Sequence, residues 1–133
     1  MTAFHTQYGL YEWLVTLFGL ANASSTFQRY VNWALCEYLD ESCLAYLDDV
    51  LIYTDGLLEQ HHEHVQKVLA KLKEAGLYLD IKKCGFDCKK TKYLGFIVQV
   101  GEGIFMDPEK VCANQEWEIP TTVKSVHRFL GFV

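Results

Sequence analysis

The sequence predicts an α+β fold, an antiparallel sheet with helices packed on one face, and three observations support this. Two segments, 24–38 and 65–76, repeat apolar residues at the spacing of amphipathic helices. Between and after them, short apolar runs are separated by turns of two or three residues, as in antiparallel hairpins. The only two prolines, Pro108 and Pro120, lie near the end, so the body of the chain should be continuous structure.

The first part of the chain is expected to form two short strands and a helix. Residues 2–16 carry β-branched and aromatic side chains around a turn at residues 8–10. From Ser24 onward the apolar residues follow helical spacing, with Asn22, Ser24 or Ser25 as a possible N-cap. The apolar stripe of this helix consists of Phe27, Val31, Ala34, Leu35 and Tyr38.

The next element is predicted to be a tight hairpin. Residues 43–47 and 50–53 are short apolar runs, and only Asp48 and Asp49 separate them. This spacing places both carboxylates in the turn between two paired strands.

A second helix, three more strands and two final helices are predicted downstream. Val65, Val68, Leu69 and Leu72 form the helical stripe, and Gly76 stands where a helix commonly ends. Segments 78–81, 93–100 and 103–106 read as strands, with a turn at 101–103. Segments 109–117 and 123–130, which follow the two prolines, read as helices.

Composition indicates a soluble, packed protein inside the cell. Its 133 residues suit one domain or a piece of one, and half of them are hydrophobic. No apolar run approaches the ~18 residues that cross a bilayer, and no secretory signal is apparent, so we expect no membrane partner. The five cysteines are then expected to be reduced. Four of them are expected to be small buried apolar residues: Cys36, Cys43, Cys84 and Cys112.

Charge is distributed unevenly along the chain. The formal net charge is −5, which argues against a surface that attracts nucleic acid everywhere. Eight of the twelve basic residues nevertheless fall between positions 67 and 92. They form either a local basic face or a solvated helix face followed by a lysine-rich loop. These residues are Lys67, Lys71, Lys73, Lys82, Lys83, Lys89, Lys90 and Lys92.

Asp48 and Asp49 are the residues most suggestive of chemistry. Adjacent carboxylates repel each other, and a two-residue hairpin turn ordinarily prefers Asn-Gly or Asp-Gly. A divalent cation relieves that repulsion, and Mg²⁺ prefers oxygen ligands. Nucleotidyl transfer commonly uses two such ions about 3.5–4 Å apart. The ordinary alternative is a solvated loop.

The string Tyr46-Leu47-Asp48-Asp49-Val50-Leu51-Ile52-Tyr53 resembles the signature hairpin of reverse transcriptases, most closely that of gypsy-like LTR retrotransposons. Other blocks of that family occur in the same order along nearly the whole chain. They are Thr2-Ala3-Phe4, Gly9 to Trp13, Phe18 to Ala23, Thr26 to Arg29, His61 to His64, Lys83-Cys84 and Tyr93 to Phe96. The resemblance implies a polymerase palm fold and RNA-directed DNA polymerase activity.

The same resemblance implies roles for particular residues. Asp48 and Asp49 would be catalytic and would hold Mg²⁺ or Mn²⁺. Lys82 or Lys83, with Lys83 preferred, would be a general acid or charge stabiliser near the pyrophosphate, or else an ordinary surface lysine. The nucleotide-binding residues would be Phe18, Gly19, Gln28, Tyr46 and Leu47. The primer grip would be Leu94, Gly95 and Phe96, which would also belong to the core of the sheet.

The resemblance also implies a domain division and partners. Residues 1–107 would be a partial palm, without the fingers and without the strand that carries a third metal-binding aspartate. Residues 108–133 would begin the thumb or connection. The partners would be an RNA or DNA template-primer and dNTPs. Because two carboxylates hold a metal pair poorly, the isolated chain is expected to have little or no polymerase activity.

Three alternatives remain open from the sequence. The chain is either a polymerase fragment or a non-catalytic palm-fold relic that acts as an interaction module. A palm without its neighbouring subdomains would expose apolar surface, which predicts a homodimer. A zinc site is a further possibility, because His61, His62 and His64 cluster at a helix start and Cys84 and Cys88 are four residues apart.

Overall fold

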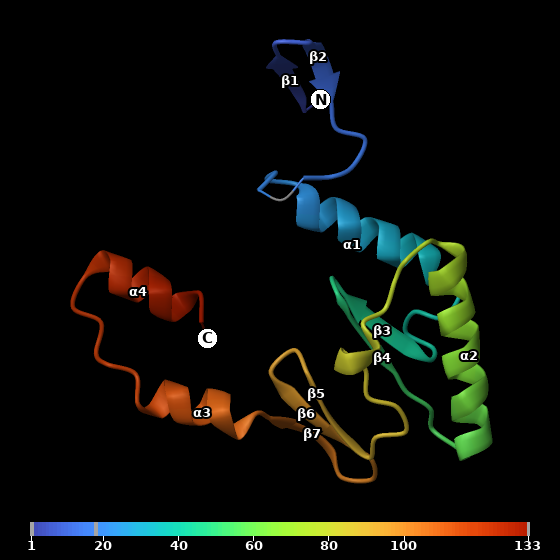
Figure 1. The fold of residues 1–133 in the computed structure, drawn as a ribbon. Coiled ribbons are helices and arrows are strands. Elements are labelled where there is room, and N and C mark those ends of the chain that lie inside the picture. The colour runs from blue at the N-terminus through green and yellow to red at the C-terminus, as the bar shows by residue number, and fades with distance from the viewer. Residues whose placement is uncertain (1, 18, 133) are drawn as a thin grey trace. The chain divides into compact units, whose positions relative to one another are not determined.

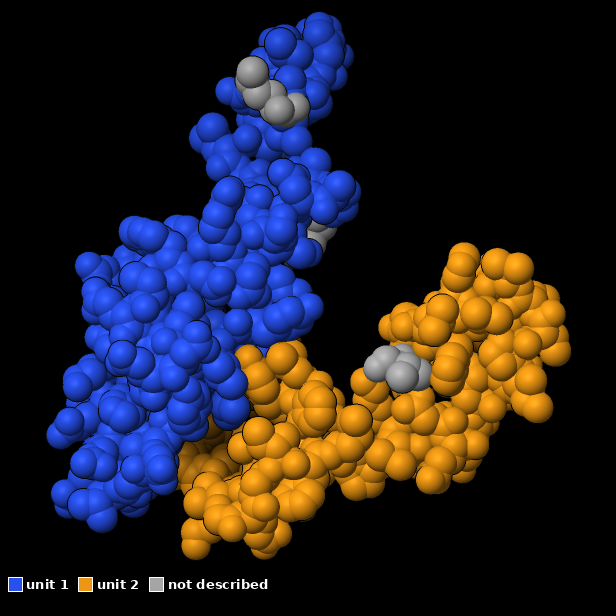
Figure 2. Space-filling model, turned by 180° about the vertical axis from the view of Figure 1, so that it is seen from behind, with its two compact units in different colours: residues 1–79 blue, residues 80–133 orange. Residues whose placement is uncertain are grey.

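The computed structural model describes residues 2–17 and 19–132, with helices and strands as drawn in Figure 1. The chain divides into two compact units, residues 1–79 and residues 80–133 (Figure 2). Every strand pair is antiparallel, and helices accompany the strands in both units. The predicted α+β class is therefore confirmed. The described strands form three small sheets, of two, two and three strands.

The first unit opens with the expected hairpin, formed by β1 (Ala3–Thr6) and β2 (Gly9–Glu12). The Thr6 hydroxyl donates to the Gly9 carbonyl at 3.2 Å and accepts from the Tyr8 backbone N–H at 3.1 Å. Gly9 has φ +131°, a conformation that other residues rarely adopt. The Thr6 hydroxyl and the conformation of Gly9 therefore both stabilise this turn.

Two helices and a second hairpin complete the first unit. Helix α1 (Ala23–Ala34) begins after Asn22, one of the three predicted cap positions, although the Asn22 side chain makes no capping hydrogen bond. The hairpin strands are β3 (Cys43–Tyr46) and β4 (Asp49–Ile52). Helix α2 (Leu58–Glu74) ends before Gly76, whose φ of +69° confirms the predicted helix end.

Both helices pack on one face of the β3–β4 hairpin. Cross-strand pairs alternate between faces, and the pairs Cys43–Ile52 and Ala45–Val50 share a face. All four of these side chains belong to or pack against the core that α1 and α2 supply. The buried core residues are Val31, Leu35, Cys43, Val68 and Leu72. The opposite face of the hairpin is therefore covered by neither α1 nor α2.

The second unit contains a three-stranded sheet followed by two helices. A short 3₁₀ helix, η1 (Ile81–Lys83), precedes β5 (Lys90–Tyr93), β6 (Phe96–Gln99) and β7 (Gly103–Met106). The last helices are α3 (Pro108–Gln115) and α4 (Val123–Leu130), both near the predicted positions. Thr122 caps α4 by accepting from the Ser125 N–H at 3.1 Å.

Two of the predicted strands were wrong. Segment 78–81 is not a strand, because its alternating side chains meet no partner strand, and Tyr78 is 98% exposed. Segment 93–100 is not a single strand either. Leu94 and Gly95 have φ of +50° and +80°, which makes them a two-residue turn between β5 and β6.

The burial of the cysteines differs from the prediction that four of them are core residues. Cys43 is fully buried, and this burial, with Asp40 nearby, raises the pKa of its thiol. Cys84 is only half-buried, while Cys36 and Cys112 are exposed, so the expectation that these three are core residues is wrong. Cys36 lies just beyond the C-cap of α1 and Cys112 lies on α3, and neither residue belongs to a buried core cluster. Among the described residues, no helix is both long and apolar enough to span a membrane.

A three-residue ion network joins β5 to the start of α3. Lys92 Nζ lies 3.0 Å from Asp107 Oδ2 and 2.7 Å from Glu109 Oε2. Asp107 also caps α3 by accepting from the Glu109 backbone N–H at 3.1 Å. Hydrogen bonds from Lys92 and from that N–H lower the pKa of Asp107, and hydrogen bonds to Glu109 and Asp107 raise the pKa of Lys92.

This network predicts a specific pH dependence of stability. A lowered aspartate pKa stabilises the fold above the ordinary value of about 4 and loses that stabilisation as pH falls through the lowered pKa. Asp107→Asn keeps a capping side chain but removes the charge. In thermal unfolding, the Tm gap between wild type and this variant should be widest near neutral pH and narrow on acidification. Glu109→Gln is the control: its side chain is 83% exposed, so its Tm should differ less from that of wild type. A Tm difference between wild type and Asp107→Asn that does not change with pH would contradict the lowered pKa of Asp107.

Candidate active site

The turn of the β3–β4 hairpin lies one residue earlier than the sequence predicted. Tyr46 pairs with Asp49 in the ladder, so the turn residues are Leu47 and Asp48, and Asp49 begins β4. Leu47 has φ +50°, and a turn that starts with a positive φ ordinarily carries glycine there. A non-glycine residue in this region costs on the order of 1–2 kcal/mol, so the surrounding structure must hold Leu47 in place.

Gln28 on α1 holds this turn through its side-chain amide. Its Oε1 accepts a hydrogen bond from the Leu47 backbone N–H. Its Nε2 donates to the Ala45 carbonyl at 3.0 Å and to Asn32 Oδ1 at 2.7 Å. Gln28 therefore contacts the hairpin backbone on either side of Tyr46, and it fixes the turn relative to α1.

Asp48 lies in the turn of the hairpin, and Asp49 lies on the hairpin face that carries neither helix. Asp48 and Asp49 are both exposed. Asp49 lies opposite Tyr46, so the two share the face that is turned away from the helices, together with the Leu44–Leu51 pair. Tyr46 is 53% exposed. This face offers the Asp49 carboxylate beside an aromatic ring and apolar side chains, and Asp48 lies in the adjoining turn.

The donor set at this turn is compatible with a hard divalent cation. Carboxylate oxygens are the ligands that Mg²⁺ and Mn²⁺ prefer, and both Asp48 and Asp49 are exposed, so an ion can approach them from solvent. Within the described part of the chain, no three His, Cys, Asp or Glu side chains form a group that could hold a metal ion. An ion bound by Asp48 and Asp49 would therefore need further ligands beyond these two carboxylates.

The remaining predicted site residues are distributed over both units. Phe18 lies outside the described residues. Gly19 is exposed with φ +88°, and a Cβ there would be strained whatever its surroundings. Lys83 belongs to the second unit, is 85% exposed, and lies 4.0 Å from Asp80 Oδ2. Its placement beside the carboxylates stays a prediction.

The predicted primer-grip residues form the turn between β5 and β6 and the start of β6. Leu94 and Gly95 are the turn residues, and Leu94 and Phe96 are each 42% exposed. The Gly95 carbonyl accepts from the Asp107 backbone N–H at 3.1 Å, which ties the turn to the start of α3. Leu94 and Phe96 therefore expose apolar surface at the tip of the β5–β6 hairpin and are not enclosed in the core of the sheet.

The described structure gives no support to the zinc alternative. The Nδ1 atoms of His61 and His64 lie 3.2 Å and 2.9 Å from the Thr54 hydroxyl, and these histidines form no group of three potential metal ligands with other described residues. Cys84 and Cys88 direct their thiols at backbone carbonyls, those of Asp80 and Phe86. The sequence showed the histidine spacing but gave no sign that Thr54 faces both rings.

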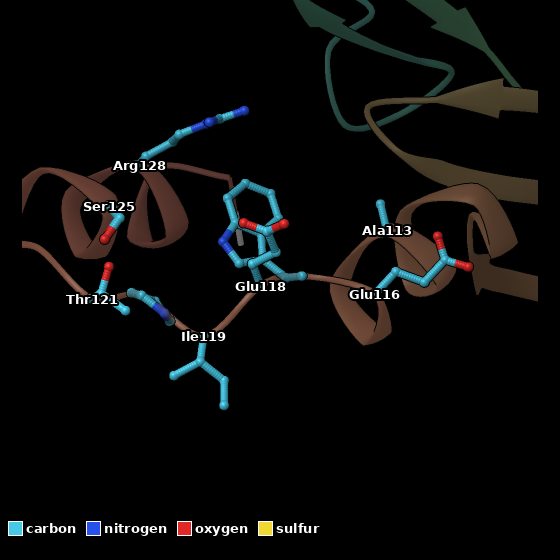
Figure 3. A pocket seen from close by; sticks show the side chains of 9 residues that line it. Ala113, Glu116, Glu118, Ile119, Thr121, Ser125 and Arg128 are labelled. Atoms are coloured by element: carbon cyan, nitrogen blue, oxygen red, sulfur yellow. The ribbon is translucent and has the colours of Figure 1, made fainter.

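One surface pocket lies far along the chain from these residues. It has a volume of about 390 Å³ and is lined by residues of α3, α4 and the segment between them (Figure 3). Arg128 lies over the Trp117 ring, 5.5 Å from its centroid. The lining contains no predicted catalytic residue, so this cavity does not define the candidate site.

Comparison with known proteins points to one family. A family model described as reverse transcriptase (RNA-dependent DNA polymerase) matches residues 1–98. The chain is 45% identical to a retrovirus-related Pol polyprotein from transposon 297 and 40% identical to one from transposon gypsy, both of Drosophila melanogaster. Each alignment covers 98% of this chain and 12% of the polyprotein. The chain therefore spans about an eighth of the length of these curated relatives.

Solved structures share the fold. A structure of the foamy viral protease-reverse transcriptase in complex with dsDNA superposes with a TM-score of 0.72 at 26% identity, over 98% of this chain and 27% of that chain. A dRH form of the same protein in complex with ds DNA gives a TM-score of 0.76 at 25% identity, over 98% and 22% of the two chains. The predicted relationship to gypsy-like polymerases is thereby confirmed.

Proposed function

Since the chain belongs to the reverse transcriptase (RNA-dependent DNA polymerase) family, we propose that it supplies the catalytic hairpin of an RNA-directed DNA polymerase. The observation that carries this proposal is the pair Asp48 and Asp49 at an exposed turn whose backbone Gln28 holds from α1. Such a turn presents carboxylates in a fixed position, as transfer of a nucleotide to a primer terminus requires.

Asp48 and Asp49 would hold Mg²⁺ or Mn²⁺. Such ions promote attack by a primer 3′ hydroxyl and stabilise the pyrophosphate that leaves. The chain itself positions the two carboxylates, because the core fixes one face of the hairpin and Gln28 fixes its turn. We assign Asp48 as the principal ligand and Asp49 as its partner.

The other assignments extend the same proposal. Phe18, Gly19, Tyr46 and Leu47 would contact the incoming nucleotide, while Gln28 would act from behind the turn. Leu94, Gly95 and Phe96 would contact the primer, an assignment that the exposure of Leu94 and Phe96 supports. Lys83, with its exposed ammonium, would donate a proton to the leaving pyrophosphate or stabilise its charge.

The proposed partners are a template-primer and dNTPs. The foamy viral relatives were solved with double-stranded DNA, and the family description names RNA as template. We place the reaction inside the cell, where dNTPs are found. In this scheme residues 1–107 are palm and residues 108–133 begin the thumb. The comparisons give no support to the alternative of a non-catalytic relic.

Activity is best tested in a chimera in which this chain replaces the aligned segment of the transposon 297 polyprotein, called here the 297 chimera. The unexchanged polyprotein is the positive control, and the 133-residue chain alone is assayed beside them. We expect Mg²⁺-dependent, templated extension by the chimera and little by the isolated chain, because the described residues lack a third metal ligand. An isolated chain that extends as fast as the chimera would contradict this part of the proposal.

We also propose that the isolated chain forms a homodimer through strand β7. This edge strand exposes three consecutive apolar side chains, with Ile104 70%, Phe105 47% and Met106 47% exposed. Exposed apolar edges tend to pair with another chain. Size-exclusion chromatography with light scattering should give a dimer mass for wild type and a monomer mass for Ile104→Lys. A wild-type monomer at every concentration would contradict the proposal.

A further inference from the structure

The Thr54 hydroxyl contacts helix α2 just beyond the end of hairpin strand β4. Thr54 follows β4 by two residues, and its Oγ1 lies 3.2 Å from His61 Nδ1 and 2.9 Å from His64 Nδ1. His61 and His64 are one helical turn apart on α2 and therefore share a face. All three side chains are half-buried.

The chemistry of these three groups makes the contact directional. A threonine hydroxyl has one proton and two lone pairs, and the Nδ1 of a neutral imidazole is either a donor or an acceptor. The hydroxyl can therefore donate to one ring and accept from the other at the same time. Valine has nearly the same shape as threonine but can do neither. Serine can do both.

The position of this contact complements that of Gln28. Apolar packing of Cys43, Ala45, Val50 and Ile52 holds the hairpin against the helices, but such packing is not directional. Gln28 fixes the turn end of the hairpin. The Tyr53 N–H bonds to the Ser42 carbonyl at 3.0 Å and closes the opposite end, where Thr54 attaches it to α2. The hairpin is thus fixed by hydrogen bonds at both ends.

We propose that Thr54, with His61 and His64, is a positioning residue that holds Asp48 and Asp49 in their reactive position by fixing the far end of the hairpin. This inference rests on the polymerase function proposed above. Small displacements of reacting groups have large effects on rate, because the chemistry requires alignment to a fraction of an ångström. Thr54 touches no reacting atom, so its effect should fall on turnover rather than on nucleotide binding.

The test compares Thr54→Val and Thr54→Ser in the 297 chimera. Thr91→Val makes the same change at a half-buried strand residue of the second unit and is the matched control. We expect Thr54→Val to lower kcat about ten-fold and leave the KM for dNTP within about two-fold. Thr54→Ser should restore kcat. Hydrogen exchange in residues 43–53 should become faster in Thr54→Val only, because the end of the hairpin is released.

The results separate this inference from the proposed function. Thr54→Val with kcat and hydrogen exchange equal to those of Thr91→Val would overturn the inference, and so would Thr54→Ser behaving like Thr54→Val. A chimera that fails to extend primers while the transposon 297 polyprotein succeeds would instead count against the polymerase function. In that case hydrogen exchange still shows whether the Thr54 hydroxyl holds the hairpin.

Discussion

Asp48→Asn should lower the rate of nucleotide incorporation by the 297 chimera by about 10³-fold, because removal of one group that stabilises transition-state charge typically costs about 10²–10³. Asparagine keeps the size of aspartate and one oxygen but loses the negative charge that holds a divalent ion. The backbone of the turn is held by Gln28 and does not depend on the Asp48 side chain. The loss should therefore appear in kcat, measured by single-nucleotide primer extension.

The matched control is Asp55→Asn, which makes the same change at an exposed position just beyond the hairpin. This variant should keep its rate within about two-fold, as surface substitutions usually do. Thermal unfolding and template-primer affinity should be unchanged in both variants. An Asp48→Asn chimera that retains a tenth or more of the wild-type rate, as an approximate limit, would remove Asp48 from the catalytic centre.

Gln28→Leu should lower kcat by about 10²-fold, because the turn that carries Asp48 loses its fixed position. Leucine fills a similar volume, but it cannot accept from the Leu47 N–H or donate to the Ala45 carbonyl. These backbone groups would exchange their partner for water, and Leu47 would be free to leave its positive φ. The free energy of unfolding should fall by about 1 kcal/mol, as for the loss of an ordinary hydrogen bond.

Two further variants show whether the amide itself is responsible. Gln66→Leu makes the same substitution at an exposed position on α2 and should have no effect on rate. Gln28→Glu keeps an acceptor for the Leu47 N–H but loses the donor to Ala45, so an intermediate kcat is expected. If Gln28→Leu and Gln66→Leu have the same kcat, Gln28 does not position the turn.

Elements with a local periodic signal could be predicted from the sequence. Helices α1, α2 and α4 each carry an apolar stripe with a recognisable start or end, such as Asn22 before α1 and Gly76 after α2. The β1–β2 and β3–β4 hairpins were predicted in the same way from short apolar runs and turn residues. These features depend on neighbours within a few positions.

Errors arose where tertiary pairing decides the outcome. The apolar run 43–47 suggested that Leu47 ends a strand, whereas the ladder ends at Tyr46 and Leu47 takes a positive φ in the turn. Leu94 likewise takes a positive φ in the turn between β5 and β6, so this turn interrupts the predicted strand 93–100. Segment 78–81 alternates correctly for a strand, but alternation forms no sheet without a partner.

The candidate site was predicted in part. Asp48 and Asp49 were apparent because adjacent carboxylates between apolar strands are unusual, and the family resemblance gave them a role. The contacts that position them join residues far apart in sequence. Gln28 is separated by 17 residues from Ala45 and by 19 from Leu47, and no local pattern indicates either contact. Thr54 gave no signal, because a hydroxyl after a strand is ordinary.

The most direct test of the central assignment is primer extension on an RNA template by the 297 chimera, with and without Asp48→Asn, in Mg²⁺. We expect the wild-type chimera to add the nucleotides that the template dictates and a chelator that removes the metal to stop extension. Asp48→Asn should be nearly inactive although it binds template-primer normally. Extension by Asp48→Asn at a rate close to wild type would contradict the assignment of this hairpin as the catalytic centre.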